Sequence, residues 1–167
     1  KDTMEIVEGD FDYVGWDLRK FLKLFSKSNP ATFEWLGSTI VYREESSFGS
    51  FMSEYRSDYF SIEASMWHYH NMAEGNWKRY ILGNGNEVPY KKYLYVLRPL
   101  LACEYMMKFR ESSPLVVDEL WFESESNLSY ELELEYVNLL NTKRSGVRMG
   151  TGPILPELHS YITERFR

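Results

Sequence analysis

Two acidic side chains near the start of the chain have the spacing of a metal-binding pair. Asp10 and Asp12 lie in segment 4–14, where apolar and acidic residues alternate as they do in a β-strand. Because side chains two residues apart on a strand share a face, the two carboxylates are expected on one face. Such a pair suits nucleotidyl transfer, in which a divalent metal is held by few carboxylates plus substrate phosphates. A solvated strand face explains the same spacing.

A second group of polar residues lies in the aromatic and basic run 91–102. A buried helical stripe is predicted at Tyr93, Val96, Leu97, Leu100 and Leu101. Lys91, Tyr95 and Arg98 fall together on another face. Pro99 has no N–H to donate to the carbonyl of Tyr95, so the helix should kink and leave that acceptor free. The polar face is therefore a candidate binding surface, and a kinked core helix with outward-reaching basic side chains is the alternative.

The composition predicts one domain with a substantial core. The chain has 167 residues, of which 44% are hydrophobic and 17% aromatic. The high aromatic share suits tightly packed helices or a groove that stacks bases. The formal net charge of -6 gives no global basic surface for duplex binding, so any phosphate binding depends on local basic clusters.

Several residue patterns exclude other classes of protein. Cys103 is the single cysteine, which excludes an internal disulfide and favours the reducing cytoplasm. No apolar run approaches the roughly 18 residues that span a bilayer, so no membrane partner is expected. His68 and His70 would lie on different faces of a helix, which argues against a shared metal site. Segment 146–152 lacks the Lys-Ser/Thr of a phosphate-binding loop and is interpreted as a simple loop.

The rest of the chain is predicted to be helical. Helices are expected over residues 18–25, 32–36, 48–55, 62–81, 90–110, 130–141 and 157–166. Asp17 is a good N-cap for the first of them. Residues 39–42 form the one other strand candidate, and a lone strand is marginal unless it joins a sheet. Since the first residue is Lys rather than Met, we expect the remaining strands to lie upstream in a longer protein.

Six short motifs follow one another along the chain. They are Asp12-Tyr13-Val14-Gly15-Trp16-Asp17-Leu18-Arg19-Lys20-Phe21-Leu22, Lys27-Ser28-Asn29-Pro30, Glu34-Trp35-Leu36, Ile40-Val41-Tyr42-Arg43, His70-Asn71-Met72-Ala73 and the run 91–102. Together, and in this order, they resemble the predicted nucleotidyltransferases associated with RNA repair, the RlaP group of the DNA polymerase beta superfamily. The resemblance covers nearly the whole chain.

The resemblance implies a mainly α fold, with one or two strands left from a mixed α/β nucleotidyltransferase sheet. Residues 1–16 would be the last strand or strands of the catalytic domain, and residues 17–167 a C-terminal helical domain. The family's sheet carries Gly-Ser, then Asp-x-Asp, then a third carboxylate. Two Mg²⁺ or Mn²⁺ ions held by these carboxylates would align a hydroxyl acceptor with the α-phosphate of a nucleoside triphosphate.

The resemblance also assigns site residues. Asp12 matches the third carboxylate and is the predicted catalytic and metal-binding residue, whereas Asp10 has no match. The predicted nucleotide-binding residues are Arg19, Lys20, Lys91, Lys92, Tyr95 and Arg98. Lys and Arg bind triphosphates, and Tyr stacks a base or bonds a sugar hydroxyl. A solvated helix face is the alternative for Arg19 and Lys20.

The sequence departs from the family pattern at the first two metal ligands. Neither Gly37-Ser38 nor Gly49-Ser50 is followed at a suitable distance by Asp-x-Asp. The resemblance therefore implies part of a nucleotidyltransferase that cannot act unaided and binds no metal tightly by itself. RNA is the candidate acceptor. The alternatives are a noncatalytic helical module that binds nucleotide, RNA or a protein partner, and a homodimer interface that buries the aromatic residues.

Overall fold

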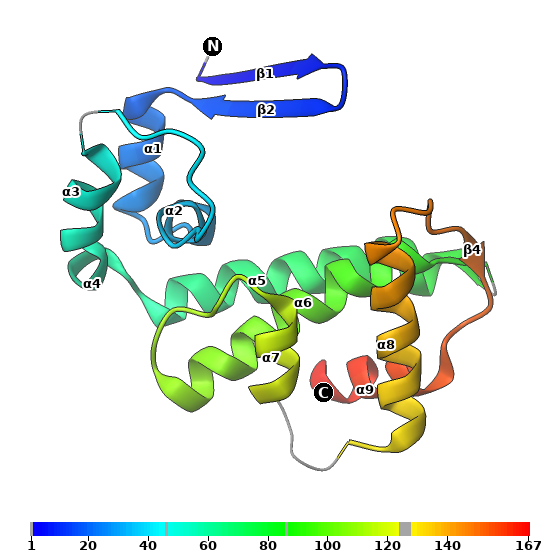
Figure 1. The fold of residues 1–167 in the computed structure, drawn as a ribbon. Helices are drawn as coiled ribbons and strands as arrows, with labels where there is room; N and C mark the ends of the chain where they lie inside the picture. Colours follow the sequence, from blue (N-terminus) through cyan, green and yellow to red (C-terminus); the bar gives the residue numbers. More distant parts are fainter. Residues whose placement is uncertain (1, 46, 86, 124–127) are drawn as a thin grey trace. The chain divides into compact units, whose positions relative to one another are not determined.

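The computed structural model describes residues 2–45, 47–85, 87–123 and 128–167, and most of them are helical (Figure 1). The predicted mainly α fold with a few short strands is confirmed. The chain divides into two compact units, Lys1–Ser65 and Met66–Arg167, which are described separately. The predicted boundary between residues 16 and 17 concerns the domains of a longer protein and stays a prediction.

The first unit opens with an antiparallel hairpin of β1 (Thr3–Glu8) and β2 (Phe11–Trp16). The prediction of one continuous strand over residues 4–14 was wrong, because Gly9 and Asp10 form the turn between the two strands. Gly9 has a φ of 59°, a conformation that a two-residue hairpin turn needs and that glycine adopts without strain. The alternation of apolar and acidic residues continues through this turn and conceals it.

The helices α1 (Leu18–Phe25), α2 (Pro30–Leu36), α3 (Phe48–Glu54) and α4 (Arg56–Tyr59) follow in this unit, which ends within the first turn of α5. The predicted cap is confirmed, since the carboxylate of Asp17 accepts a hydrogen bond from the N–H of Arg19 at 2.9 Å. Asn29 caps α2 in the same way, through the N–H of Ala31 at 3.1 Å. The strand predicted at residues 39–42 was wrong. These residues are exposed and irregular, because β-branched composition alone does not supply a pairing partner.

Aromatic rings fill the core of the first unit. Phe25 and Phe33 stack with their ring centroids 5.0 Å apart, and Trp16 packs on Trp35 at 4.2 Å. The connection between α1 and α2 is held by Ser28, which is buried with a φ of 55°. Its hydroxyl accepts a hydrogen bond from the N–H of Ser61 at 2.8 Å. The Lys-Ser-Asn-Pro motif therefore has a structural role, as a turn and a helix cap.

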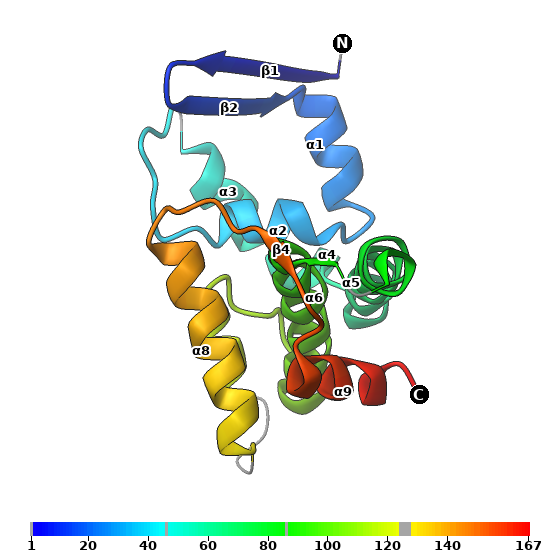
Figure 2. The same cartoon turned by 90° about the vertical axis from the view of Figure 1, so that its right-hand side faces the viewer.

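The second unit is built around one long helix. Its elements are the greater part of α5 (Ile62–Asn76), the π-helix η1 (Trp77–Ile81), the 3-10 turn η2 (Leu82–Asn84), β3 (Val88–Pro89), α6 (Tyr90–Phe109), α7 (Val117–Glu123), α8 (Tyr130–Arg144), β4 (Thr151–Gly152) and α9 (Pro156–Arg165). Helix α6 contacts η1, α7, α8 and α9, and Figure 2 shows α8 and α9 as separate helices beside it. Helix α7 lies between the helices predicted at residues 90–110 and 130–141, where the sequence predicted no helix.

The apolar stripe predicted on α6 is confirmed, since all five of its side chains are at most 4% exposed. Pro99 is buried inside the same helix. Tyr93 is completely buried, and its hydroxyl accepts a hydrogen bond from the N–H of Leu155 at 3.3 Å. This bond holds the segment that leads into α9 against helix α6.

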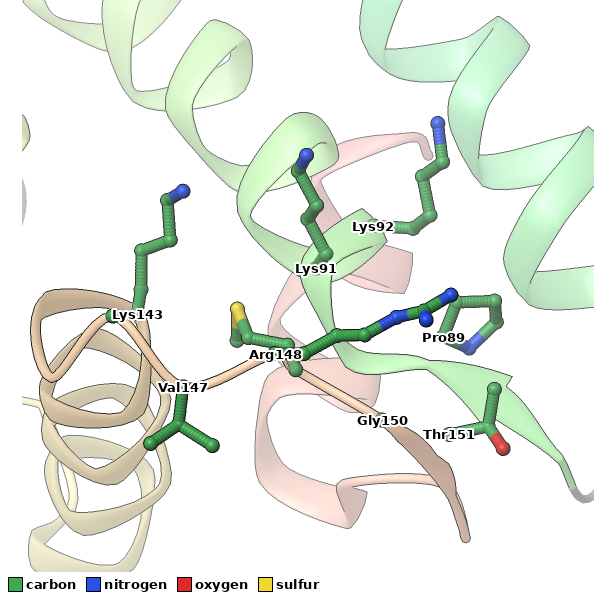
Figure 3. Close-up of a pocket in the computed structure, with 10 residues that line it drawn as sticks. Pro89, Lys91, Lys92, Lys143, Val147, Arg148, Gly150 and Thr151 are labelled. Carbon is green, nitrogen blue, oxygen red and sulfur yellow. The ribbon is translucent and has the colours of Figure 1, made fainter. Parts of the chain in front are cut away.

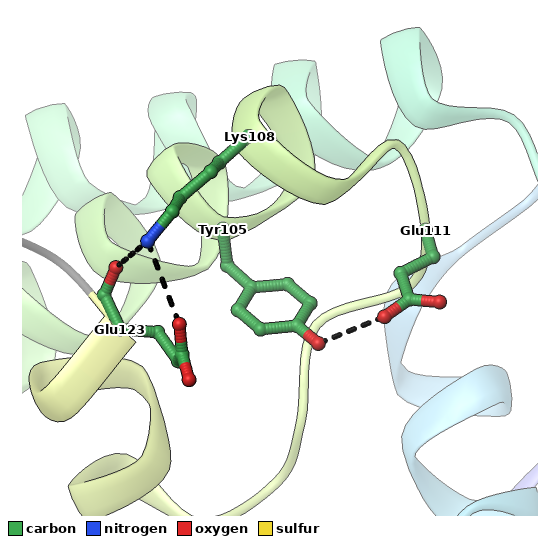
Figure 4. Close-up of polar contacts among 4 residues, drawn as sticks. All are labelled: Tyr105, Lys108, Glu111 and Glu123. Carbon is green, nitrogen blue, oxygen red and sulfur yellow. Dashed lines mark hydrogen bonds and ion pairs between the residues drawn. The ribbon is translucent and has the colours of Figure 1, made fainter.

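Polar contacts hold the connection between α6 and α7 (Figure 4). The Nζ of Lys108 donates to the backbone carbonyl of Glu123 at 2.9 Å and lies 3.5 Å from its carboxylate. The hydroxyl of Tyr105 donates to the carboxylate of Glu111 at 2.9 Å. Both contacts start on α6, so the end of this helix anchors α7 and the connection before it.

A partly buried histidine, His159, should make the stability of the second unit depend on pH. The Nδ1 of His159 is buried and has no hydrogen-bond partner among the described residues, and its ring lies 4.6 Å from that of Trp77. Burial lowers the pKa of His159 below its ordinary value of about 6.5. The unfolded chain then binds this proton more readily than the folded chain, so stability should fall as the pH drops below about 6.5.

Urea unfolding at about pH 7.5 and about pH 5 tests this expectation. His159→Phe keeps a ring against Trp77 but cannot titrate, so the loss of stability between the two pH values should shrink. His68 is exposed, and His68→Phe is the matched control that should leave the loss unchanged. An equal pH dependence in His159→Phe and the parent protein would show that another group is responsible.

Candidate functional site

Asp12 lies on β2, opposite Val7 of β1, and its side chain is exposed. Asp10 lies in the hairpin turn, so the expectation that both carboxylates share one strand face was wrong. By the alternation of a strand, Asp12 shares its face with Val14 and Trp16. Within the described ranges, no group of three or more His, Cys, Asp or Glu side chains could hold a metal ion. Asp12 can therefore supply one carboxylate to a metal site, but the described part of this chain does not complete one.

A basic pocket lies along α1, directly after β2. Its volume is about 650 Å³, and it is lined by Asp2, Asp17, Arg19, Lys20, Lys23, Leu24 and Lys27. The structure thus brings together Arg19 and Lys20, which the sequence predicted as nucleotide-binding residues. Lys23 and Lys27 were not predicted. Lys23 follows Lys20 by three residues within α1, so the helical period would have placed these two lysines on one face, whereas Lys27 lies in the turn after the helix.

Lys20 connects α1 to the hairpin. Its Nζ donates a hydrogen bond to Thr3 Oγ1 and lies 4.9 Å from the centroid of the Trp16 ring. Arg19 is exposed, and its side chain has no ion pair with a described carboxylate. Of the two predicted residues, Arg19 is therefore the one available to a ligand, whereas Lys20 also has a structural role.

A second basic pocket lies in the other unit, at the start of α6 (Figure 3). Its volume is about 730 Å³, and it is lined by Pro89, Lys91, Lys92, Lys143, Gly146, Val147, Arg148, Met149, Gly150 and Thr151. We call it the α6 pocket. Lys91 and Lys92 were predicted from the sequence, whereas Lys143 and Arg148 were not. The glycine-containing segment interpreted as a simple loop forms one wall and ends in β4, which pairs with β3.

The remaining predicted residues, Tyr95 and Arg98, do not line the α6 pocket. The ring of Tyr95 is 42% exposed, and the amines of Lys91 and Lys92 lie 5.3 Å and 4.7 Å from its centroid. Lys91 and Tyr95 thus share one face of the helix, as the period predicted. Arg98 is half-buried farther along α6 and makes contacts of its own. Tyr95 is placed to position the two lysines.

Cys103 is buried on α6, and its Sγ lies 3.6 Å from the backbone carbonyl of Met66. Burial raises the pKa of this thiol to about 12. The thiol therefore stays protonated at neutral pH and is unsuited to nucleophilic catalysis.

No helix in the described ranges has the length and apolarity needed to cross a bilayer.

Comparisons with known proteins identify the family. The model of the RlaP family, described as the RNA repair pathway DNA polymerase beta family, matches residues 1–167. The chain is also 41% identical, over 151 residues, to the uncharacterized protein YcgL of Bacillus subtilis (strain 168). That match covers 90% of this chain and 56% of the relative, so the chain spans little more than half of the relative's length. No solved structure matches it.

The chain belongs to the RlaP family of RNA repair pathway DNA polymerase beta proteins, and the resemblance inferred from its motifs is confirmed.

Proposed function

We propose that this chain is part of a nucleotidyltransferase that transfers a nucleoside monophosphate from a nucleoside triphosphate to a hydroxyl acceptor, with RNA as the acceptor. The family match over the whole chain is the observation that carries this proposal. The order of elements supports it, since an exposed Asp12 on β2 is followed at once by the basic pocket of α1.

In this proposal, the carboxylate of Asp12 is one ligand of a divalent metal ion, Mg²⁺ or Mn²⁺. Phosphate oxygens of the nucleotide would supply further ligands, as is usual for Mg²⁺. The other carboxylates must come from residues outside the described part of this chain. The bound ion would supply stabilisation of the charge that develops on the transferred phosphoryl group.

In each of the two units, taken by itself, cationic side chains would bind phosphate groups of a substrate. Arg19 and Lys20 line the α1 pocket, and Lys91 and Lys92 line the α6 pocket. Guanidinium and ammonium groups neutralise phosphate oxygens and orient the leaving pyrophosphate. We include Tyr95 and Arg98 in the proposed nucleotide site, with Tyr95 acting through the lysines that it holds.

A noncatalytic phosphate-binding module is the second candidate. It is favoured by one observation, that the described residues contain no cluster of three potential metal ligands. The two candidates differ in a simple assay. The full-length protein, incubated with Mg²⁺, a nucleoside triphosphate and an oligoribonucleotide, should release pyrophosphate and extend or label the RNA. A noncatalytic module would bind these molecules without releasing pyrophosphate.

Arg19→Gln tests the α1 pocket in the same assay. We expect the KM for the nucleoside triphosphate to rise about 5-fold, because one exposed charge contact to phosphate is worth up to about 1 kcal/mol. The melting temperature should not change, since the Arg19 side chain is exposed. Arg43→Gln is the control, because Arg43 is exposed in the same unit and pairs with Glu45. An unchanged KM in Arg19→Gln would show that Arg19 does not bind the nucleotide and belongs only to a solvated helix face.

A further inference from the structure

The α6 pocket is formed by three segments that lie far apart in the sequence. The start of α6 contributes Lys91 and Lys92, the last turn of α8 contributes Lys143, and the loop before β4 contributes Arg148. Figure 3 shows the amines of the three lysines extending to the same side, with Arg148 reaching out from the loop. Four cationic side chains thus line one pocket, although the chain as a whole has a formal net charge of -6.

No carboxylate in the described part of the chain neutralises the charge of this pocket by an ion pair. No carboxylate is among its lining residues, and none of the described carboxylates forms an ion pair with any of the four cations. Glu87 accepts a hydrogen bond from the hydroxyl of Thr151 at 2.8 Å. The α1 pocket differs, because Asp2 and Asp17 line it beside its cations. Like charges gathered in one concave site repel one another, and a bound anion relieves that repulsion.

Contacts outside the pocket position two of its cations. The Nζ of Lys92 lies 3.8 Å from the centroid of the Tyr80 ring and 4.7 Å from that of Tyr95. The Nζ of Lys91 lies 5.3 Å from the centroid of the Tyr95 ring. Aromatic faces attract an ammonium group and restrict its motion without neutralising its charge. Less conformational entropy is then lost when the two lysines bind an anion.

The backbone holds the wall opposite these lysines in place. Val88 pairs with Gly152, and Pro89 pairs with Thr151. The N–H of Tyr90, the first residue of α6, donates to the carbonyl of Gly150 at 3.1 Å. Because the loop is fastened to the helix start in this way, Arg148 is kept at the same pocket as Lys91 and Lys92.

We propose that the α6 pocket binds a polyphosphate chain, and that Lys143 and Arg148 are phosphate-binding residues alongside Lys91 and Lys92. A polyphosphate carries several negative charges over a short span, which matches four cations grouped around one pocket. The volume of about 730 Å³ lies within the range of small-molecule sites, about 300–1,000 Å³. The inference rests on the proposed function only in naming a nucleoside triphosphate as the biological source of the polyphosphate.

The test is a calorimetric titration of the full-length protein with inorganic tripolyphosphate in the absence of divalent metal. Lys143→Gln and Arg148→Gln should each weaken binding about 5-fold, and the double variant roughly 20-fold, because each removes one exposed charge contact to the anion. Arg144→Gln is the matched control. Arg144 follows Lys143 directly but pairs with Asp118 and does not line the pocket, so its replacement should leave the affinity unchanged.

The other arms of the experiment identify the source of the phosphate. ATP should compete with tripolyphosphate, and Asp12→Asn should bind tripolyphosphate as the parent protein does, so this inference and the proposed transfer reaction can fail separately. Equal tripolyphosphate affinity in the parent and double variant, with circular dichroism spectra unchanged, would overturn the proposal. A protein that binds an oligoribonucleotide at these residues but not tripolyphosphate would overturn it as well.

Discussion

Asp12→Asn should lower the rate of nucleotidyl transfer by the full-length protein at least about 100-fold, because an amide cannot replace an anionic metal ligand at the reacting phosphate. The fold should be unaffected. Asp12 is exposed on β2, and Asn has nearly the same shape as Asp. The variant should therefore keep the melting temperature and the circular dichroism spectrum of the parent protein. The measurement is the rate of pyrophosphate release with saturating nucleoside triphosphate and Mg²⁺.

Asp10→Asn is the matched control for this experiment. Asp10 lies two residues away, in the hairpin turn, and Asn is tolerated in such turns. Its replacement removes the same charge from the same hairpin but should leave the transfer rate within a few-fold of the parent. If Asp12→Asn kept the parent rate, or if Asp10→Asn lost as much activity, Asp12 would not be the metal ligand.

The long helix α6 could be predicted because one local pattern determines it. Tyr93, Val96 and Leu97 recur with the helical period, and the same residues are buried in the structure. The hairpin was missed because its local pattern does not show where the chain turns. The alternation of acidic and non-acidic residues runs from Val7 to Tyr13, with Gly9 in a non-acidic position, so only the turn chemistry of Gly9 marks the reversal of the chain.

The residues that line the α6 pocket could be grouped from the sequence only where they are neighbours along the chain. Lys91 and Lys92 stand out beside aromatic residues at the start of one helix. Lys143 and Arg148 reach the same pocket because β4 pairs with β3, and these strands have two residues each. Strands this short have no period to recognise. Non-local pairing of this kind is therefore not visible in the sequence.

Motif residues that identify the family are not all site residues. Asn29 belongs to the Lys-Ser-Asn-Pro motif, yet its side chain caps α2. Ser28 of the same motif is buried and hydrogen-bonded to the backbone of Ser61. A turn and a cap constrain residue type as strictly as ligand binding does, so geometry is needed to separate the two roles.

Gly152→Ala should destabilise the second unit by about 1–3 kcal/mol, the usual cost of forcing an extra carbon into a packed site. A Cβ at position 152 would lie 2.8 Å from the Cζ of Tyr90 and closer still to its hydroxyl oxygen. The ring of Tyr90 or the β3–β4 pairing has to move to make room. Since that pairing holds Arg148 at the α6 pocket, tripolyphosphate binding should weaken together with stability.

Two further variants, measured by urea unfolding and tripolyphosphate titration, test whether the contact with Tyr90 causes the losses in Gly152→Ala. Gly150→Ala adds the same methyl group two residues earlier, where no described atom beyond the adjoining residues lies within 4 Å of the new Cβ, so stability should change by less than about 0.5 kcal/mol. Tyr90→Ala combined with Gly152→Ala removes the obstructing ring, so the double variant should lose less stability than the sum of the single changes. Strict additivity would mean that Gly152 is required for a reason other than its contact with Tyr90.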